Sequence, residues 1–198
     1  MGRKSSRALW SAKLAGQGVS EAVTVEAIEA QFAAKREPFD GTVLGVDPSL
    51  RGTGLAVVKF VPGEPTQLVG SHTLKLKAKA TQSDCLGEIA RAVSAILEKE
   101  TITCVSLEQT IYVQNFQTAQ IMGMARGAVI ATAAMRGLPI HEYAPLRIKQ
   151  AVVGYGRASK EQVAAMVRQH LKLMADLPSD EADAAAAALC HAMTGARS

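Results

Sequence analysis

Apolar residues gather into short segments whose spacing changes along the chain. Runs rich in Val and Leu at 42–47, 53–61 and 66–76 are separated by turn-forming Asp, Pro and Gly residues, which predicts a three-stranded meander. Helical spacing of apolar residues follows over 82–99, and the apolar run at 102–108 predicts a fourth strand. A strand reached through a crossover helix pairs in parallel, and the first strand is its best partner.

The second half of the chain predicts further helices and one more strand. A stretch dominated by Ala, Gly and Met at 116–136 predicts a long helix, and 139–144 predicts a short fifth strand. Ser159 and Gln162 predict a capping box, and Ser179 is expected to be the N-cap of the last helix. The sum is an α/β protein with a five-stranded mixed sheet flanked by helices, in which strands one, four and five are parallel.

The first forty residues differ in pattern from the remainder. They have a basic opening and a helix-like stretch from Ser20 whose apolar positions recur at mixed spacings. Such a segment could pack on the body, bind a partner or form a poorly ordered arm. We therefore expect an N-terminal extension, helical or disordered, over 1–40 and one globular domain over 41–198.

Composition adds three expectations. With 48% hydrophobic and 20% charged residues in 198, the chain is expected to form a compact globular body. No apolar run reaches the roughly 18 to 20 residues that span a bilayer, so we expect a cytoplasmic protein with no membrane partner. The three cysteines are far apart in apolar surroundings, which favours buried small side chains over a disulfide framework or a zinc site.

Four acidic residues lie at strand ends or on a helix face where a carboxylate is expected to need a compensating positive charge. Asp47 and Glu108 end two apolar strands, at the kind of edge where ligand sites of α/β folds gather. Asp180 and Asp183 are three residues apart, on one face of the last helix. Because converging carboxylates repel one another unless a cation neutralises them, the pattern predicts a metal site, with Mg²⁺ as the simplest ion.

Three of the four acids, all but Asp183, also have an ordinary alternative. Asp47 precedes a proline and could hydrogen-bond its own turn, and Glu108 could form a buried salt bridge. Asp180 and Glu181 could complement the dipole of the last helix. The net charge of +4 decides little, but basic residues crowd the stretch between the second and third acidic sites, which suits a phosphodiester. They are Arg126, Arg136, Arg147, Lys149, Arg157 and Lys160.

Four segments follow one another across about residues 41–195. They are GVDPSLRGTGLAVV, LEQT with QTAQIMGMARG, EYAPLRIKQAVVGYGRASKEQV, and DEADAAAAALCHA. Their content and order resemble the RuvC Holliday-junction resolvases, within the ribonuclease H-like nuclease superfamily. Ordered segments are more specific than a lone motif. The resemblance implies a ribonuclease H-like fold.

The resemblance also implies a catalytic set. The acids that match the family's metal-binding tetrad are Asp47, Glu108, Asp180 and Asp183. Glu181 falls outside this pattern, and His191 matches a family histidine whose role as a satisfied helix residue we favour over that of a ligand. Two Mg²⁺ ions per site are implied, and Mn²⁺ accepts the same oxygen ligands.

Basic and aromatic candidates surround this set. Lys149 and Lys160 match positively charged family residues near the active site, so Lys149 is expected to be catalytic and both are expected to contact DNA, unless they are solvated surface lysines. Arg126 and Arg157 are further candidates for DNA contact. In place of the family's aromatic residue three positions after the second acid, this chain has Ile111. Tyr112 beside it is the candidate that stacks on a base, shifted by one position.

By resemblance, the expected function is that of a crossover junction endodeoxyribonuclease. Such a hydrolase resolves Holliday junctions in recombination and repair by Mg²⁺-dependent paired nicking of opposed strands. Expected partners are a four-way DNA junction and a second copy in a homodimer, with a branch-migration motor as a further candidate. The helix at 118–134 is either the dimer contact or simply packed on the sheet.

Two alternative functions remain. One is another ribonuclease H-like nuclease that acts on a different branched or hybrid nucleic acid. The other is a non-catalytic nucleic-acid-binding scaffold, against which four mutually repelling acids argue.

Overall fold

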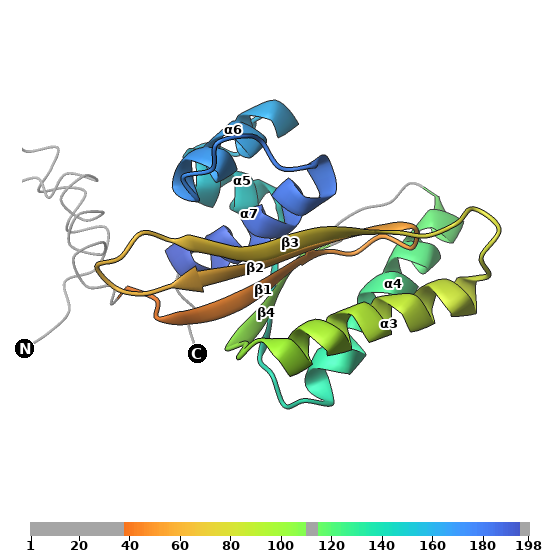
Figure 1. Cartoon of the computed structure of the whole chain (residues 1–198). Helices are drawn as coiled ribbons and strands as arrows, with labels where there is room; N and C mark the ends of the chain where they lie inside the picture. The colour runs from red at the N-terminus through yellow and green to blue at the C-terminus, as the bar shows by residue number, and fades with distance from the viewer. Residues whose placement is uncertain (1–37, 110–114, 195–198) are drawn as a thin grey trace, which may run out of the picture. The chain divides into compact units, whose positions relative to one another are not determined.

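The computed structural model describes residues 38–109 and 115–194, and Figure 1 shows the arrangement of their helices and strands. The elements in chain order are β1 Gly41–Asp47, β2 Gly52–Phe60, β3 Gln67–Lys75, α3 Gln82–Lys99, β4 Cys104–Glu108, α4 Phe116–Ala134, β5 Ile140–Tyr143, α5 Pro145–Val153, α6 Lys160–His170 and α7 Ser179–Thr194. The predicted strands and the helices at 82–99 and 116–136 are confirmed, with ends that differ by at most two residues.

The five strands form one mixed sheet in the order β3-β2-β1-β4-β5. Strand β2 pairs antiparallel with both β1 and β3, whereas β4 pairs parallel with both β1 and β5. The predicted mixed sheet is thereby confirmed, including the parallel pairing of the first and fourth strands. The carboxyl ends of β1, β4 and β5 consequently lie along one edge of the sheet.

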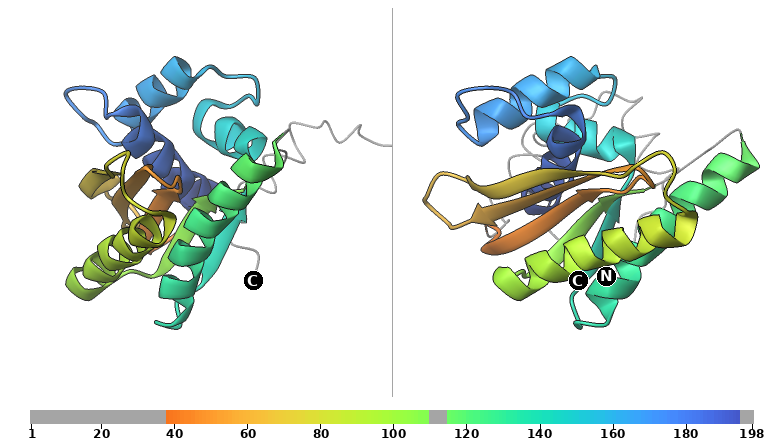
Figure 2. Two further views of the ribbon diagram at one scale, coloured as in Figure 1. Left: turned by 90° about the vertical axis from the view of Figure 1, so that its right-hand side faces the viewer. Right: turned by 45° about the vertical axis from the view of Figure 1, so that its right-hand side comes forward.

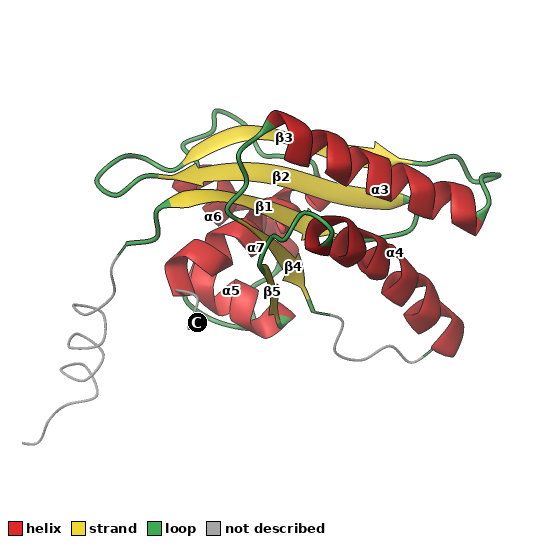
Figure 3. Ribbon diagram, turned by 90° about the horizontal axis from the view of Figure 1, so that it is seen from below, coloured by secondary structure: helices red, strands yellow, loops and turns green. Residues whose placement is uncertain are grey.

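Helices cover both faces of the sheet. In Figure 2, α5, α6 and α7 lie on one face and α3 and α4 on the other, and Figure 3 shows the second face from below. Side chains that alternate along β1 divide between two cores, because Val43 packs with α7 whereas Leu44 and Val46 pack with α3 and α4. Both faces of the central strands are therefore buried.

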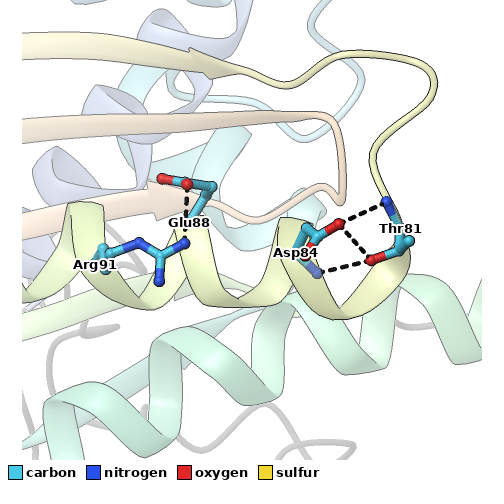
Figure 4. A network of polar contacts seen from close by, with 4 residues as sticks. All are labelled: Thr81, Asp84, Glu88 and Arg91. Carbon is cyan, nitrogen blue, oxygen red and sulfur yellow. Dashed lines mark hydrogen bonds and ion pairs between the residues drawn. The ribbon is translucent and has the colours of Figure 1, made fainter.

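Helix α3 is fixed at its start by a capping box that Figure 4 shows from close by. The Asp84 N–H donates to Thr81 Oγ at 3.2 Å, and the Thr81 N–H donates to Asp84 Oδ2 at 3.2 Å. One face of the helix buries Ile89 and Val93, and the exposed face carries an ion pair between Glu88 and Arg91. The cap and the apolar face together account for the position of this crossover helix.

Two other helix starts were predicted from their caps. The box at α6 is confirmed, because the Ser159 N–H donates to Gln162 Oε1 at 2.9 Å and the Gln162 N–H donates to Ser159 Oγ at 3.3 Å. Helix α7 already begins at Ser179, since the Ala182 N–H donates to the Pro178 carbonyl oxygen at 2.9 Å. The prediction that Ser179 is the N-cap is therefore wrong by one residue.

Helix α5 was not predicted as a separate helix. Pro145 opens it, where a missing N–H costs nothing, and Gly154 ends it with a left-handed φ of 97°. Ile148 and Val152 are one turn apart and buried. Proline at the start, glycine after the end and this apolar pair were all visible in the sequence.

Helix α7 lies so close to β1 and β2 that two strand positions have to be glycine. A Cβ on Gly45 would collide with the Ala184 carbonyl oxygen, and a Cβ on Gly54 would collide with the Asp180 carbonyl oxygen. The facing helix contributes a run of buried alanines at 184–188. Small residues on both surfaces thus bring the helix backbone against the sheet.

The first forty residues lie mostly outside the described part of the chain. Pro38–Ser198 form one compact unit, and the expected extension over 1–40 and its boundary stay predictions. All three cysteines, Cys85, Cys104 and Cys190, are free and buried, as expected. Within the described ranges, no helix combines the length and the apolar character needed to cross a bilayer.

Gly45→Ala is expected to lower the free energy of unfolding by about 1 to 3 kcal/mol, because the new methyl group overpacks the contact with α7. Urea unfolding followed by circular dichroism measures this change. Gly70→Ala on β3 is the matched control, since a Cβ at Gly70 meets no atom within 4 Å. Equal losses in the two variants would contradict the proposed role of the close contact.

Candidate active site

The pleat of the sheet brings two acids to the same face. Asp47 is the last residue of β1 and Glu108 the last of β4, and the parallel register pairs the residues just before them, Val46 and Leu107. On β4 the side chain of Ser106 points at α7, where its hydroxyl donates to the Ala187 carbonyl oxygen at 2.7 Å. Because alternate residues share a face, Glu108 also faces α7, as Asp47 does from β1.

Helix α7 supplies the other two acids. Asp180 and Asp183 lie near its N-terminus, where the close contact at Gly54 holds the Asp180 backbone against β2. A Cβ on Gly52 would lie 3.4 Å from Asp180 Oδ2. The structure thus gathers all four predicted acids at the carboxyl ends of β1 and β4.

The pKa values of Asp47 and Glu108 are perturbed by burial and by the neighbouring acids. The pKa of Asp47 is raised to about 7, first by burial and then by the charges of Asp183, Glu108 and Asp180 in that order, against an opposing effect of Lys160. The pKa of Glu108 is also raised, first by burial and then by Asp183. Perturbed carboxyl groups that share one edge of a sheet are typical of functional sites.

Two lysines lie beside the acids. Lys160, the first residue of α6, donates from Nζ to Asp183 Oδ2 at 3.1 Å, and this bond raises the pKa of Lys160. The Lys160 side chain is 72% exposed, so the pair is screened by solvent and easily opened. Lys149 on α5 lies near enough to Glu108 that its charge opposes the rise in the pKa of Glu108. Both lysines are therefore available to a bound anion.

The remaining predicted residues lie elsewhere. Arg126 on α4 forms an ion pair with Glu142, and within the described ranges its buried Nε has no hydrogen-bond partner. Arg157 is exposed on the loop between α5 and α6. Ile111 and Tyr112 lie outside the described residues. Of the four predicted DNA contacts apart from Tyr112, only Lys149 and Lys160 are thus shown beside the acids.

Glu181 has a role that the sequence did not reveal. Its carboxylate accepts hydrogen bonds from Ser71 Oγ at 2.6 Å and from Thr73 Oγ1 at 3.2 Å, both on the edge strand β3. The side chain therefore turns towards β3 rather than to Asp47 and Glu108. Ser71 and Thr73 share a strand face, but only the fold brings this face next to α7. Glu181 acts as a clamp on the first turn of that helix.

The donor set fits a hard divalent cation. The four acids offer only carboxylate oxygens, the ligands that Mg²⁺ and Mn²⁺ take. Burial, and after it the charges of neighbouring acids, raises the pKa of Asp47 and of Glu108, and a bound cation would oppose both effects. Among the described residues, no three of the four acids have carboxylate oxygens that all lie within 4.8 Å of one another. Carboxylates that repel one another are expected to draw together only around a cation.

Asp47→Asn is expected to stabilise the metal-free protein above pH 7. The folded state holds the Asp47 proton up to a pKa of about 7, against an ordinary value of 3.8, so it binds more protons than the unfolded state in this range. The contribution of Asp47 to stability therefore falls as the pH rises between these values. Urea unfolding with a chelator should show a difference between wild type and variant that grows over this range and then levels off.

Asp84→Asn is the control of opposite sign. Hydrogen bonds with Thr81 lower the pKa of Asp84, so its carboxylate contributes stability at neutral pH, and loss of the capping box should destabilise the protein there. If Asp47→Asn were as destabilising as Asp84→Asn above pH 7, the folded state would not raise the pKa of Asp47.

Glu181→Ala is expected to lower the free energy of unfolding by about 1 to 3 kcal/mol, because it leaves the partly buried hydroxyls of Ser71 and Thr73 without an acceptor. Glu181→Gln should recover part of the loss, since its amide oxygen still accepts one bond. Urea unfolding gives the stabilities, and calorimetric titration with Mg²⁺ shows whether loosening of α7 weakens cation binding. Glu64→Ala, on an exposed loop, is the control and should change neither quantity.

A family model and proteins of known description match most of this chain. A family model described as crossover junction endodeoxyribonuclease RuvC matches residues 43–191. The crossover junction endodeoxyribonuclease RuvC of Halorhodospira halophila is 45% identical over 150 residues, which cover 76% of this chain and 89% of that protein. The protein of the same description from Burkholderia pseudomallei is 41% identical over 153 residues, which cover 77% and 84%.

Solved structures agree with this result. The structure described as T. thermophilus RuvC in complex with Holliday junction substrate matches with a TM-score of 0.74 and 34% identity, over 78% of this chain and 94% of that chain. The yeast mitochondrial Holliday junction resolvase matches with a TM-score of 0.55 over 90% and 87%, and at 12% identity it shows the fold alone. The expected ribonuclease H-like fold is confirmed, and the chain belongs to the RuvC family of crossover junction endodeoxyribonucleases.

Proposed function

We propose that this chain is a structure-selective endodeoxyribonuclease that resolves Holliday junctions by paired nicking of opposed strands during recombination and repair. The observation that carries the proposal is the convergence of four carboxylates, with two lysines beside them, in a member of the RuvC family. The Holliday junction substrate bound to the T. thermophilus relative supports a four-way DNA junction as the partner of this chain.

The proposed ligands of the catalytic cations are the four gathered acids, Asp47, Glu108, Asp180 and Asp183. We infer two Mg²⁺ ions per site, for which Mn²⁺ can substitute, because all of the donors are hard carboxylate oxygens. When bound, such ions polarise a phosphodiester and lower the pKa of a water that attacks it. The part of this chain is to hold the four carboxyl groups near one another on two strands and one helix, and the bound cations would favour their ionised forms.

The lysines attract the phosphate. Lys149 and Lys160 add positive charge next to acids that would otherwise repel a nucleic acid. The exposed pair between Lys160 and Asp183 can open, which frees the ammonium group for a DNA phosphate and the carboxylate for a cation. Lys149 is the proposed catalytic lysine. We leave Arg126 out of this set because its charge is already paired with Glu142.

The DNA surface extends beyond these lysines. Arg157 is exposed on the loop before α6 and is a proposed backbone contact. Tyr112 follows β4 in the sequence and is the proposed residue that stacks on a base at the junction. Residues 41–198 form the proposed nuclease domain, preceded by the extension over 1–40, and the cytoplasm is its proposed location.

A two-fold homodimer suits a junction with approximate two-fold symmetry. Helix α4 has one side buried against the body through Ala125, Val129 and Ala133. The other side exposes glycines and large apolar side chains: Phe116, Gly123, Met124 and Gly127. One side of the helix thus packs on the body, and the exposed side is the proposed dimer contact. A branch-migration motor remains the further candidate partner.

Cleavage of a synthetic four-way junction with Mg²⁺, beside a linear duplex of the same strands at one salt concentration, tests the proposal. Symmetrically paired nicks in the junction alone are expected. Asp183→Asn should abolish cleavage while junction binding persists, because it removes one carboxylate ligand and leaves the lysines in place. Asp176→Asn, an exposed aspartate outside the acidic site, is the matched control and should cleave normally.

The other outcomes separate the alternatives. Equal cutting of junction and duplex would indicate a general nuclease, and junction binding without cleavage by the wild type would indicate a scaffold. Normal turnover by Asp183→Asn would contradict the assignment of the acidic tetrad.

A further inference from the structure

A second cluster of metal-ligand side chains lies apart from the acids. Cys104 on β4, His141 on β5 and His191 on α7 each present one ligand atom, and these three atoms lie within 4.8 Å of one another. Across residues 38–109 and 115–194, no other group of three or more His, Cys, Asp and Glu side chains meets this distance. We propose that this cluster is a second metal site, for a borderline or soft transition-metal ion such as Zn²⁺.

The sheet places the three residues on one face. His141 pairs across the strands with Ser106, whose hydroxyl contacts α7, and Cys104 lies two residues before Ser106 on the same face of β4. His191 arrives from α7, which covers that face. The cluster therefore joins two strands and one helix that are far apart in the sequence.

The donors differ in kind from those of the acidic site. A thiolate and two imidazoles suit Zn²⁺ and related ions, whereas Mg²⁺ prefers oxygen ligands. Zinc bonds of about 2.0 to 2.3 Å in a tetrahedron need donors roughly 3.5 Å apart. Side-chain shifts of about 1 Å would bring the three donors to that spacing. Uptake of the ion replaces the Cys104 S–H bond by a metal–sulfur bond and releases the proton to solvent.

The surroundings of His191 resemble those of a metal-bound imidazole. Its Nδ1 lies 2.8 Å from the Tyr143 hydroxyl. In the proposed site the ring proton is on Nδ1, which donates to the Tyr143 hydroxyl and leaves the Nε2 lone pair for the ion. A hydrogen bond of this kind usually fixes the orientation of a ligating histidine. The Phe39 ring lies nearly perpendicular to the His191 ring at a centroid distance of 4.9 Å, and His191 is buried.

His141 is the residue that has to move. In the structure its ring stacks on that of His191, with centroids 4.3 Å apart and an angle of 30° between the planes. Stacked rings do not direct their nitrogens at one point, so binding requires His141 to turn about its Cβ–Cγ bond. His141 is only half-buried, which gives it room to turn and gives a water access as fourth ligand.

The two metal sites lie at opposite ends of the same elements. Cys104 and Glu108 are the first and last residues of β4, about 13 Å apart along a strand. His191 follows Asp183 by eight residues, about 12 Å along a helix. An ion at the cluster is thus remote from the scissile phosphate. It would instead tie β4, β5 and α7 together at the end opposite the acids, which is a structural role.

Cobalt titration of the full-length protein in excess Mg²⁺ tests the site, because Co²⁺ replaces Zn²⁺ and its bond to a thiolate gives a charge-transfer band in the near ultraviolet. We expect this band in the wild type and in Cys85→Ala, which removes a buried cysteine on α3 outside the cluster. Cys104→Ala should lose the band. His141→Gln removes a ligand at a half-buried position, so it should weaken Co²⁺ and Zn²⁺ binding by more than the roughly 10- to 100-fold that loss of an outer-shell partner costs.

Zn²⁺ should also raise the melting temperature of the wild type and of Cys85→Ala, and not that of Cys104→Ala. Mg²⁺-dependent cleavage by Cys104→Ala should equal that of the wild type, which separates this test from the test of the acidic site. A wild-type protein without the band, or a band of equal strength in Cys104→Ala, would overturn the proposal.

Discussion

The structure depends on the close contact between helix α7 and the strands β1 and β2. Neither surface offers long side chains at this contact, since glycines at 45 and 54 face a helix whose buried positions are mainly alanine. Backbone approaches backbone, and the start of the helix is thereby set against the ends of the strands. If this contact were wider, Asp180 and Asp183 would stand away from Asp47, and the four acids would not form a site.

The packing of α7 on the sheet brings the four acids together against their mutual repulsion. Burial of Asp47 and Glu108 disfavours their charged forms, and the neighbouring carboxylates add repulsion, so the pKa of each is raised. Packing and hydrogen bonds elsewhere on the helix offset this repulsion, through the Glu181 clamp on β3 and the bond from Ser106 to the helix backbone. The fold therefore keeps the four carboxyl groups near one another at a cost in electrostatic free energy that a bound cation would reduce.

Much of this arrangement could be read from the sequence because it follows from local rules. Strand alternation, a crossover helix and two acids at strand ends were enough to predict the parallel pairing of β1 with β4 and the meeting of Asp47 with Glu108. Helix α5 was missed although Pro145 and Gly154 mark its ends. The Glu181 clamp joins residues more than 100 positions apart, and no spacing rule reports a contact of that kind. The cluster of Cys104, His141 and His191 was not predicted for the same reason, since these residues are far apart in the sequence.

The alanine surface of α7 has a consequence for precision. An alanine side chain has no rotamers to lose on burial, so ordering this face costs little conformational entropy, and it also has no alternative rotamer in which to repack. The depth of the helix on the sheet is consequently set by van der Waals contact between nearly rigid surfaces. The packing therefore fixes the backbone positions of the two acids on α7 relative to the strand ends, and only the acidic side chains would have to move when a cation binds.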